Sequence, residues 1–203
     1  MSEPGRGGAA LPAAASTSAG SLALALVPVG ALALVVAVDA VARSREWPVL
    51  VVGLLDEPAH LATAVIFLAA FLPRRALALL PWALAASVLI DLDHVPLYLR
   101  GVLADADGGR PVTHSLTTVA VLLAAGAAFS RLRSPLVGLA LGVVLHLVRD
   151  LATGPGLSPL WPVNPAAVRL PYVAYLVPLS LVAALATVRP LISRRADRSH
   201  HRS

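Results

Sequence analysis

Long apolar runs separated by short polar segments make up most of this chain. About 20 consecutive apolar residues cross a bilayer core about 30 Å thick, so runs of this length predict transmembrane helices. The runs cover residues 21–38, 49–72, 76–99, 112–129, 135–153 and 171–188. The pattern therefore predicts an all-α fold, an integral membrane helical bundle of about six transmembrane helices with short loops.

The ends of this bundle are expected to differ from its centre. Residues 1–20 are rich in Gly, Ala, Ser and Pro, which predicts a disordered N-terminal tail, and residues 191–203 form a basic C-terminal tail. Between them, residues 21–190 are expected to fold as a single transmembrane domain. The first run could also be a signal peptide, but its length and its distance from Arg6 favour a retained helix. In the second run, Pro58 suits a first helical turn, so the membrane helix is expected to begin there.

Composition supports a membrane protein. Hydrophobic residues make up 58% of the chain and charged residues only 13%, with a mean hydropathy of +0.80, far from the averages of soluble domains. The chain has no cysteine, so any metal must be held by oxygen and imidazole ligands. The arginines follow the predicted membrane topology and lack interleaved aromatic residues, so the high pI does not indicate a nucleic-acid partner.

The arginines divide unevenly between the two sides of a six-helix topology. The side with both termini would carry ten of the sixteen arginines and two of the eleven acidic residues. The positive-inside rule then places both termini in the cytoplasm and the protein in the cytoplasmic (inner or plasma) membrane. The remaining loops lie on the opposite side.

The polar segments whose side chains could bind a metal or take part in catalysis all fall on that opposite side. Ionisable residues at membrane depth are costly and commonly mark functional sites. The four segments are Asp56-Glu57-Pro58-Ala59-His60, Asp91-Leu92-Asp93-His94, Thr113-His114-Ser115 and His146-Leu147-Val148-Arg149-Asp150. They lie at the start of the second helix, the end of the third, the start of the fourth and the end of the fifth. This shared depth predicts one metal centre, although each segment alone is also compatible with a polar packing network.

Residue spacing within the segments supports shared ligation. His146 and Asp150 are four residues apart and lie on one helical face, and Glu57 and His60 have the three-residue spacing found in metal-binding helix bundles. In the third helix, Asp91 and His94 are expected on neighbouring positions of one face. Asp93 is expected to point elsewhere unless that last turn unwinds.

The same segments resemble a known family, the YdjM-like membrane-bound metal-dependent hydrolases, also described as LexA-binding, inner-membrane-associated hydrolases. The matching features are His60, the segment from Ile90 to His94, the segment from Arg110 to Ser115, His146 with Asp150 and Thr153, then Gly156 and the Trp161-Pro162 pair. The resemblance covers roughly residues 57–171. The chain departs from the family pattern at Ile90, where the family has Pro, and at Gly109, where it has His.

The motifs and the resemblance together imply a membrane-embedded metal-dependent hydrolase with one or two divalent ions, Zn²⁺ or Mn²⁺. The expected metal ligands are His60, Asp91, Asp93, His94, His114, His146 and Asp150. The expected catalytic residues are Glu57, as general base, and Asp93. Thr113, Ser115 and Thr153 are expected to orient the ligands by hydrogen bonds without binding the metal themselves.

The expected reaction is attack of metal-activated water on a lipid-linked ester or phosphoester, with phospholipid or polyprenyl phosphate reaching the site from the bilayer. Arg110 and Arg149 could hold an anionic head group, or could only balance the neighbouring acids. Two other functions stay open: a divalent-ion or proton transporter, and a non-catalytic membrane adaptor with a structural metal. The apolar cytoplasmic halves of the helices and the lack of an inverted repeat favour a one-sided pocket.

Overall fold

Helices and their connections make up the structure, a computed structural model that describes residues 14–100 and 110–200. The α-helices are α1 (Ala14–Arg43), α2 (Val49–Phe71), α3 (Leu80–Leu89), α4 (Val95–Tyr98), α5 (Leu116–Ala128), α6 (Arg133–Asp150) and α7 (Tyr172–His200). The 3-10 helices are η1 (Arg74–Leu79), η2 (Ile90–His94) and η3 (Ser130–Leu132). Within the described residues there is no β-strand, and the predicted all-α class is confirmed.

Five helical segments of the described chain are long and apolar enough to cross a membrane. They are Ala23–Arg43, Val49–Phe71, Arg74–Leu97, Ser130–Asp150 and Tyr172–Arg189. The fourth expected helix is shorter than residues 112–129, because α5 begins only at Leu116. Its 13 residues rise about 20 Å at 1.5 Å per residue, less than the thickness of a bilayer core. Ser115, with φ −145° and ψ 159°, is extended and excludes the preceding residues from the helix.

Other helix boundaries also differ from the expected ones. Pro58 lies inside α2, so this helix does not begin there, and membrane helices tolerate an internal proline where neighbouring groups satisfy the freed backbone. The helix α1 continues past residue 38 to Arg43, which places Asp39 within its last turns. The boundaries expected at residues 20 and 190 both fall inside helices. Residues 1–13 and 201–203 lie outside the described part.

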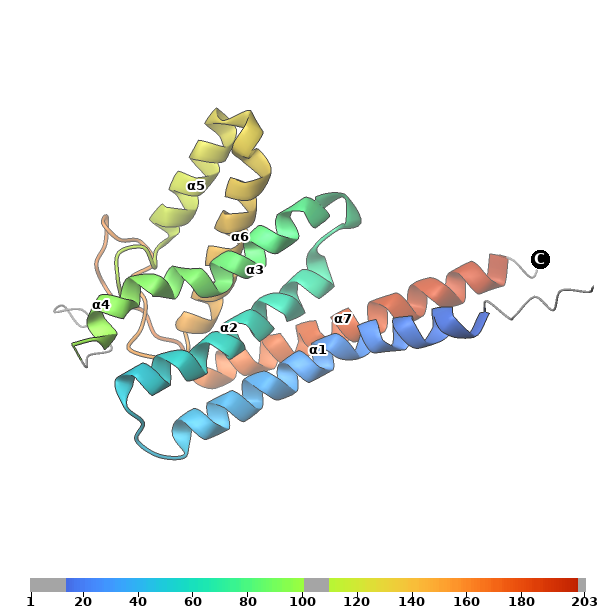
Figure 1. The fold of residues 1–203 in the computed structure, drawn as a ribbon, viewed down its shortest axis with the longest axis horizontal. Helices are drawn as coiled ribbons and strands as arrows, with labels where there is room; N and C mark the ends of the chain where they lie inside the picture. The colour runs from blue at the N-terminus through green and yellow to red at the C-terminus, as the bar shows by residue number, and fades with distance from the viewer. Residues whose placement is uncertain (1–13, 101–109, 201–203) are drawn as a thin grey trace, which may run out of the picture.

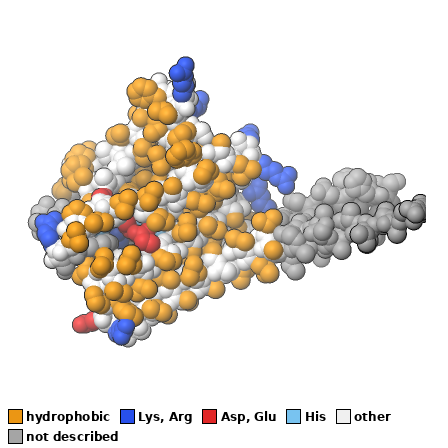
Figure 2. All heavy atoms as spheres, in the orientation of Figure 1, with side chains coloured by type: hydrophobic (Ala, Val, Ile, Leu, Met, Phe, Trp, Pro, Cys, Tyr) orange, Lys and Arg blue, Asp and Glu red, His pale blue; other side chains and the backbone are white. Residues whose placement is uncertain are grey.

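Two layers of helices pack against each other. The helices α1, α2 and α7 form one layer, α3, α5 and α6 form the other, and α2 joins them by contacting α3 and α6 (Figure 1). The first layer packs around Val35, Ile66 and Leu179. On the face seen in Figure 2, hydrophobic side chains cover most of the described surface, as expected for helices that face lipid.

A stripe of residues spaced by four brings α3 and α6 into close contact. On α6, Gly138 and Gly142 precede His146 and Asp150 on the same face. A Cβ atom on Gly142 would lie 2.8 Å from the Cβ of Ala86 on α3, closer than carbon atoms approach. Small residues at this spacing allow membrane helices to pack backbone to backbone. The glycines therefore place α3 beside His146, the next residue of the stripe.

This close contact predicts opposite effects for two identical substitutions. An added Cβ normally stabilises a helical glycine position by about 0.5–1 kcal/mol, and Gly30 of α1 has no atom that such a Cβ would meet. In contrast, Gly142→Ala should destabilise the protein by about 1–3 kcal/mol through overpacking. Thermal unfolding in detergent of Gly142→Ala beside Gly30→Ala measures the difference. Equal or greater stability of the Gly142 variant would contradict the packing.

Candidate metal centre

Histidine and aspartate side chains from four separate segments meet at one end of the bundle. The end is the one that carries α4 and the connection between α1 and α2 (Figure 1). The buried residues that meet there are His60, Asp91, His94, His114, His146 and Asp150, with Asp93 partly buried. They come from α2, η2, the segment before α5, and α6. The structure thus brings together all the ligands expected from the sequence.

The possible ligand atoms form overlapping groups rather than one ring. Within each group, one nitrogen or oxygen atom per residue lies within 4.8 Å of the others. The groups are Asp91 with Asp93, His94 and His114; His60 with Asp91 and His146; His114 with His146 and Asp150; and Asp56 with His60 and Asp150. Each of five residues belongs to two groups. Shared members of this kind suit one ion or two neighbouring ions.

The 3-10 geometry of η2 explains how Asp93 joins the centre. A 3-10 helix has three residues per turn and is tighter than an α-helix, so residues three apart lie on the same face. Asp93 Oδ1 lies 2.9 Å from His94 Nδ1, and Asp93 Oδ2 lies 3.3 Å from His114 Nδ1. Asp91 Oδ1 lies 2.8 Å from His114 Nε2. The last turn of the third helix is therefore tightened rather than unwound, and Asp93 still points inward.

The orientation of His146 is fixed by the backbone of α3. Its Nδ1 lies 3.0 Å from the carbonyl oxygen of Ser87, and since a carbonyl only accepts, Nδ1 donates. The other ring nitrogen, Nε2, faces Asp150 Oδ2 at 3.0 Å and Asp91 Oδ1 at 3.3 Å. A histidine that donates to a backbone carbonyl through one nitrogen and presents the other to ligand oxygens is typical of metal sites. The close packing of α3 on α6 makes this arrangement possible.

His60 lies parallel to His146 and connects the centre to α2. The two ring centroids are 3.7 Å apart with an angle of 7° between the planes. His60 Nε2 lies 3.3 Å from Asp56 Oδ2 and 3.4 Å from Asp150 Oδ1. Asp56, which the sequence did not single out as a ligand, thereby enters the centre through His60.

Several buried atoms of the centre make no hydrogen bond within the described part of the chain. These atoms are His60 Nδ1, His114 Nδ1, His146 Nε2 and Asp150 Oδ2. Unsatisfied polar atoms are costly to bury, and most buried polar groups have a partner. A cation between the imidazole nitrogens and carboxylate oxygens would satisfy them, and this donor set suits Zn²⁺ or Mn²⁺. The residues therefore fit a divalent metal.

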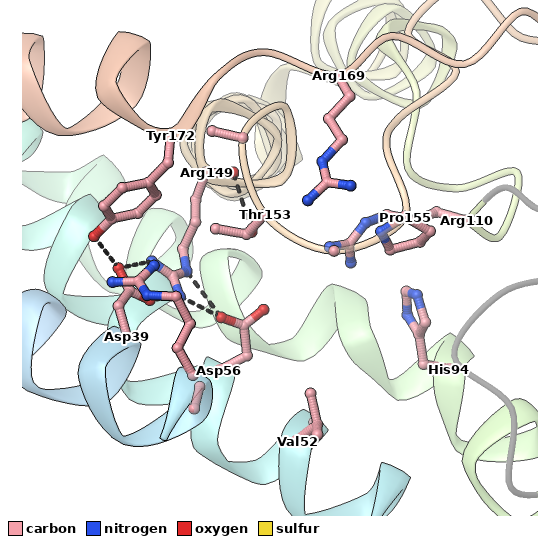
Figure 3. A pocket seen from close by; sticks show the side chains of 15 residues that line it. Asp39, Val52, Asp56, His94, Arg110, Arg149, Thr153, Pro155, Arg169 and Tyr172 are labelled. Atoms are coloured by element: carbon pink, nitrogen blue, oxygen red, sulfur yellow. Dashed lines mark hydrogen bonds and ion pairs between the residues drawn. The ribbon is translucent and has the colours of Figure 1, made fainter. Parts of the chain in front are cut away.

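The guanidinium group of Arg149 is buried in an ion-pair network beside the centre (Figure 3). Its Nη2 lies 2.6 Å from Asp39 Oδ1 and 2.5 Å from Asp56 Oδ1. The hydroxyl of Tyr172 donates to Asp39 Oδ2. These contacts correspond to the charge-balancing role that the sequence left open for Arg149. Asp39 could not be recognised from the sequence, because it follows the apolar run 21–38 and so lies outside the helix expected there.

Arg110 contacts the candidate ligand Asp150 directly. Its Nη2 lies 2.9 Å from Asp150 Oδ1. Gly154, with φ +69°, leaves room for this side chain, since a Cβ there would lie 2.7 Å from Arg110 Nη2. Gly109, where the family pattern has His, lies outside the described residues.

The three expected supporting residues make different contacts. Thr113 donates a hydrogen bond to Asp93 Oδ2, so it contacts a candidate ligand. Ser115 donates to the carbonyl of Val112 at 3.0 Å, and Thr153 donates to the carbonyl of Arg149 at 3.2 Å. Ser115 and Thr153 therefore contact backbone carbonyls, and Thr153 also lines the neighbouring cavity.

Glu57 and a cavity complete the surroundings of the centre. The buried Oε2 atom of Glu57 has no hydrogen bond among the described residues. A cavity of about 330 Å³ lies beside the centre, between α1, α2, α6 and the start of α7 (Figure 3). His94 and Arg110 line it, so the cavity reaches the candidate metal centre.

The fold and the site define an integral membrane protein with a buried histidine and aspartate centre at one end of its bundle. The family model of the YdjM inner membrane protein matches residues 55–201. The chain therefore belongs to the YdjM inner membrane protein family, which confirms the resemblance found in the sequence. Comparisons with curated proteins and with solved structures found no significant match. The matched range includes every candidate ligand but begins after α1 and Asp39.

The Arg149 network predicts a large loss of stability when its cation is removed. Arg149→Met would leave Asp39 and Asp56 buried without their partner, which typically costs about 3–5 kcal/mol. Arg100, an exposed arginine that donates to the carbonyl of Pro96, provides the matched control Arg100→Met, which should change stability little. Thermal unfolding in detergent compares the two variants. The triple variant Arg149→Met, Asp39→Asn, Asp56→Asn should recover part of the loss, and unchanged stability of Arg149→Met alone would contradict the network.

Proposed function

We propose that this protein is a membrane-embedded metal-dependent hydrolase that acts on a lipid-linked ester or phosphoester. The observation that carries the proposal is the overlap of four histidine and aspartate groups at the wall of a cavity. The unsatisfied atoms of His60, His114 and His146 support a cation at the same place. Family membership supports a location in the inner membrane.

The metal would be held by the ligands expected from the sequence, with Asp56 as an additional candidate. The residues are His60, Asp91, Asp93, His94, His114, His146 and Asp150. When bound, a divalent cation promotes the ionisation of water and stabilises the negative charge that develops on the reacting oxygen. The oxygen of the ester and the attacking water would approach from the cavity side, because that wall includes His94 and Arg110.

Glu57 is the proposed general base. Its Oε2 is buried and makes no hydrogen bond in the described part of the chain, so it can accept a proton from water. Asp93 is the second candidate, and its hydrogen bond from Thr113 orients the carboxylate. Arg110 holds Asp150 in position through an ion pair, and its side chain also lines the cavity. Arg149 is assigned to the ion-pair network with Asp39 and Asp56.

A second candidate function, ion or proton transport, requires polar groups distributed across the membrane. All buried aspartates, histidines and arginines of the described part belong to the end of the bundle that holds the centre; they are Asp39, His60, Asp91, His94, His114, His146, Arg149 and Asp150. Such a distribution favours a one-sided site over a pathway. A non-catalytic adaptor with a structural metal would not need the cavity.

We also propose that both termini are cytoplasmic and that the centre lies near the opposite face of the membrane. The described segments run alternately toward and away from the centre, so α1 begins and α7 ends at the far end of the bundle (Figure 1). Arginines are concentrated at that far end in the sequence, as the positive-inside rule requires for a cytoplasmic side.

Metal content tests the centre directly. Purified protein should contain about one or two equivalents of Zn²⁺ or Mn²⁺, and His146→Ala with Asp150→Ala should lose this metal while the helical circular dichroism spectrum is kept. His200 and His201 of the tail can bind metal independently, so His200→Ala with His201→Ala is the matched control and should retain it. Elemental analysis decides the matter. A parent protein without metal, even after reconstitution with either ion, would refute the hydrolase.

The role of Glu57 predicts a loss of rate without a loss of metal. With bis(p-nitrophenyl) phosphate as a general phosphodiester probe, Glu57→Gln should lower turnover by about a hundredfold or more, because a general base is removed. Glu46→Gln, at an exposed glutamate between α1 and α2, should leave turnover unchanged. Absorbance of released nitrophenol and elemental analysis are measured on the same samples. Full activity of Glu57→Gln would assign the base elsewhere.

A further inference from the structure

The cavity beside the metal centre carries more arginine than its acids can balance. Among the described residues, its wall contains the arginines Arg43, Arg110, Arg149 and Arg169, but only two acids, Asp39 and Asp56. Both aspartates are bound by Arg149, and Asp39 also accepts from Tyr172. The acids of the cavity are therefore already engaged, and Arg110 is paired with Asp150, so Arg43 and Arg169 give the cavity a positive field.

Arg169 is the arginine whose placement the metal centre does not explain. It lies in the connection between α6 and α7, and Figure 3 shows its side chain extending into the space above Arg110. Its side chain lines the cavity, where the ion pairs of the described residues are made by Arg110 and Arg149 and not by Arg169. A guanidinium group has five donors in a planar fork that matches phosphate.

The backbone holds Arg169 in place from both sides. Val168 donates to the carbonyl of Leu157 at 2.7 Å and accepts from the amide of Leu157 at 3.0 Å. Leu170 donates to the carbonyl of Leu151 at the end of α6 at 2.5 Å. Gly156, with φ +109°, provides the turn that this pairing needs. Since its neighbours are fixed on both sides, the direction of Arg169 is a built feature of the loop.

We propose that Arg169, together with Arg110, binds a phosphate group of the substrate in this cavity. Arg110 connects the two parts of the site, because its Nη2 is 2.9 Å from Asp150 Oδ1 and its side chain also lines the cavity. A phosphate between the two arginines lies next to the ligands of the metal. The proposal rests on the hydrolase function and narrows its substrate to a phosphate-bearing molecule.

Arg149 and Arg43 do not take this role. The donors of Arg149 are directed at Asp39 and Asp56, and Arg43 lies over the ring of Tyr172 at 4.5 Å from its centroid. A volume of about 330 Å³ accommodates a phosphate head group rather than a long chain. The phosphate can come from a lipid head group or from a soluble molecule, and these sources are distinguished by experiment.

Binding of radiolabelled inorganic phosphate to the purified full chain tests the proposal without requiring turnover. Arg169→Gln should weaken phosphate binding roughly ten- to hundredfold, since a charge-assisted, bidentate contact is lost. Arg169→Lys should recover only part of the affinity, because lysine lacks the planar fork. The matched control is Arg45→Gln, at an exposed arginine that stacks on Trp47 outside the cavity, and it should bind as the parent does.

Two further measurements are needed. One identifies the source of the phosphate, and the other distinguishes failure of the phosphate site from failure of the hydrolase proposal. Nanodiscs containing phosphatidic acid should displace labelled phosphate when the natural source is a lipid, and nanodiscs of phosphatidylcholine alone should not. Displacement by neither would assign the pocket to a soluble phosphate. Elemental analysis of Arg169→Gln should show the metal content of the parent.

The outcomes are separable. Equal phosphate affinity of Arg169→Gln and the parent, or no phosphate binding by the parent, overturns the phosphate site while the metal results still decide the hydrolase. If the parent contains no metal but Arg169→Gln still loses phosphate binding, the hydrolase fails and the anion site remains.

Discussion

Arg149 must have carboxylate partners to be buried, and this requirement couples the helices of the bundle to the candidate metal centre. One guanidinium group on α6 binds Asp39 of α1 and Asp56 of α2, and Tyr172 of α7 contacts Asp39 in turn. Asp56 also contacts His60, so the network continues into the candidate ligands. Removing one member of a buried ion pair exposes its partner to a large desolvation penalty. The positions of α1, α2 and α7 are therefore coupled to the shape of the centre.

The glycine stripe of α6 supplies the second requirement, close contact with α3. A residue with a side chain at Gly142 would move α3 away and lengthen the contact between His146 and the carbonyl of Ser87. One face of α6 thus has two roles: its glycines set the distance to α3, and His146 and Asp150 provide candidate ligand atoms.

Much of this arrangement could be predicted from the sequence, because it depends on local spacing and on topology. Apolar run lengths gave the helical bundle, and the position of each polar motif at a helix end gave the convergence. The pairing of Arg149 with Asp39 could not be predicted, since it joins residues 110 positions apart and the helix was expected to end at residue 38. The 3-10 turn at η2 and the short α5 depend on contacts of Asp93 and His114 that form only in the folded chain. Sequence patterns carry local periodicity but not these long-range contacts.

The short helix α5 has a consequence for the surrounding lipid. It rises about 20 Å where the hydrocarbon core is about 30 Å thick, and Arg131 and Arg133 follow it directly. Their guanidinium groups must reach the polar interface, so the hairpin of α5 and α6 creates a hydrophobic mismatch that thins the adjacent leaflet. The protein is therefore sensitive to bilayer thickness on the side where α5 and α6 face the lipid. Membranes with shorter acyl chains accommodate this side with the least deformation.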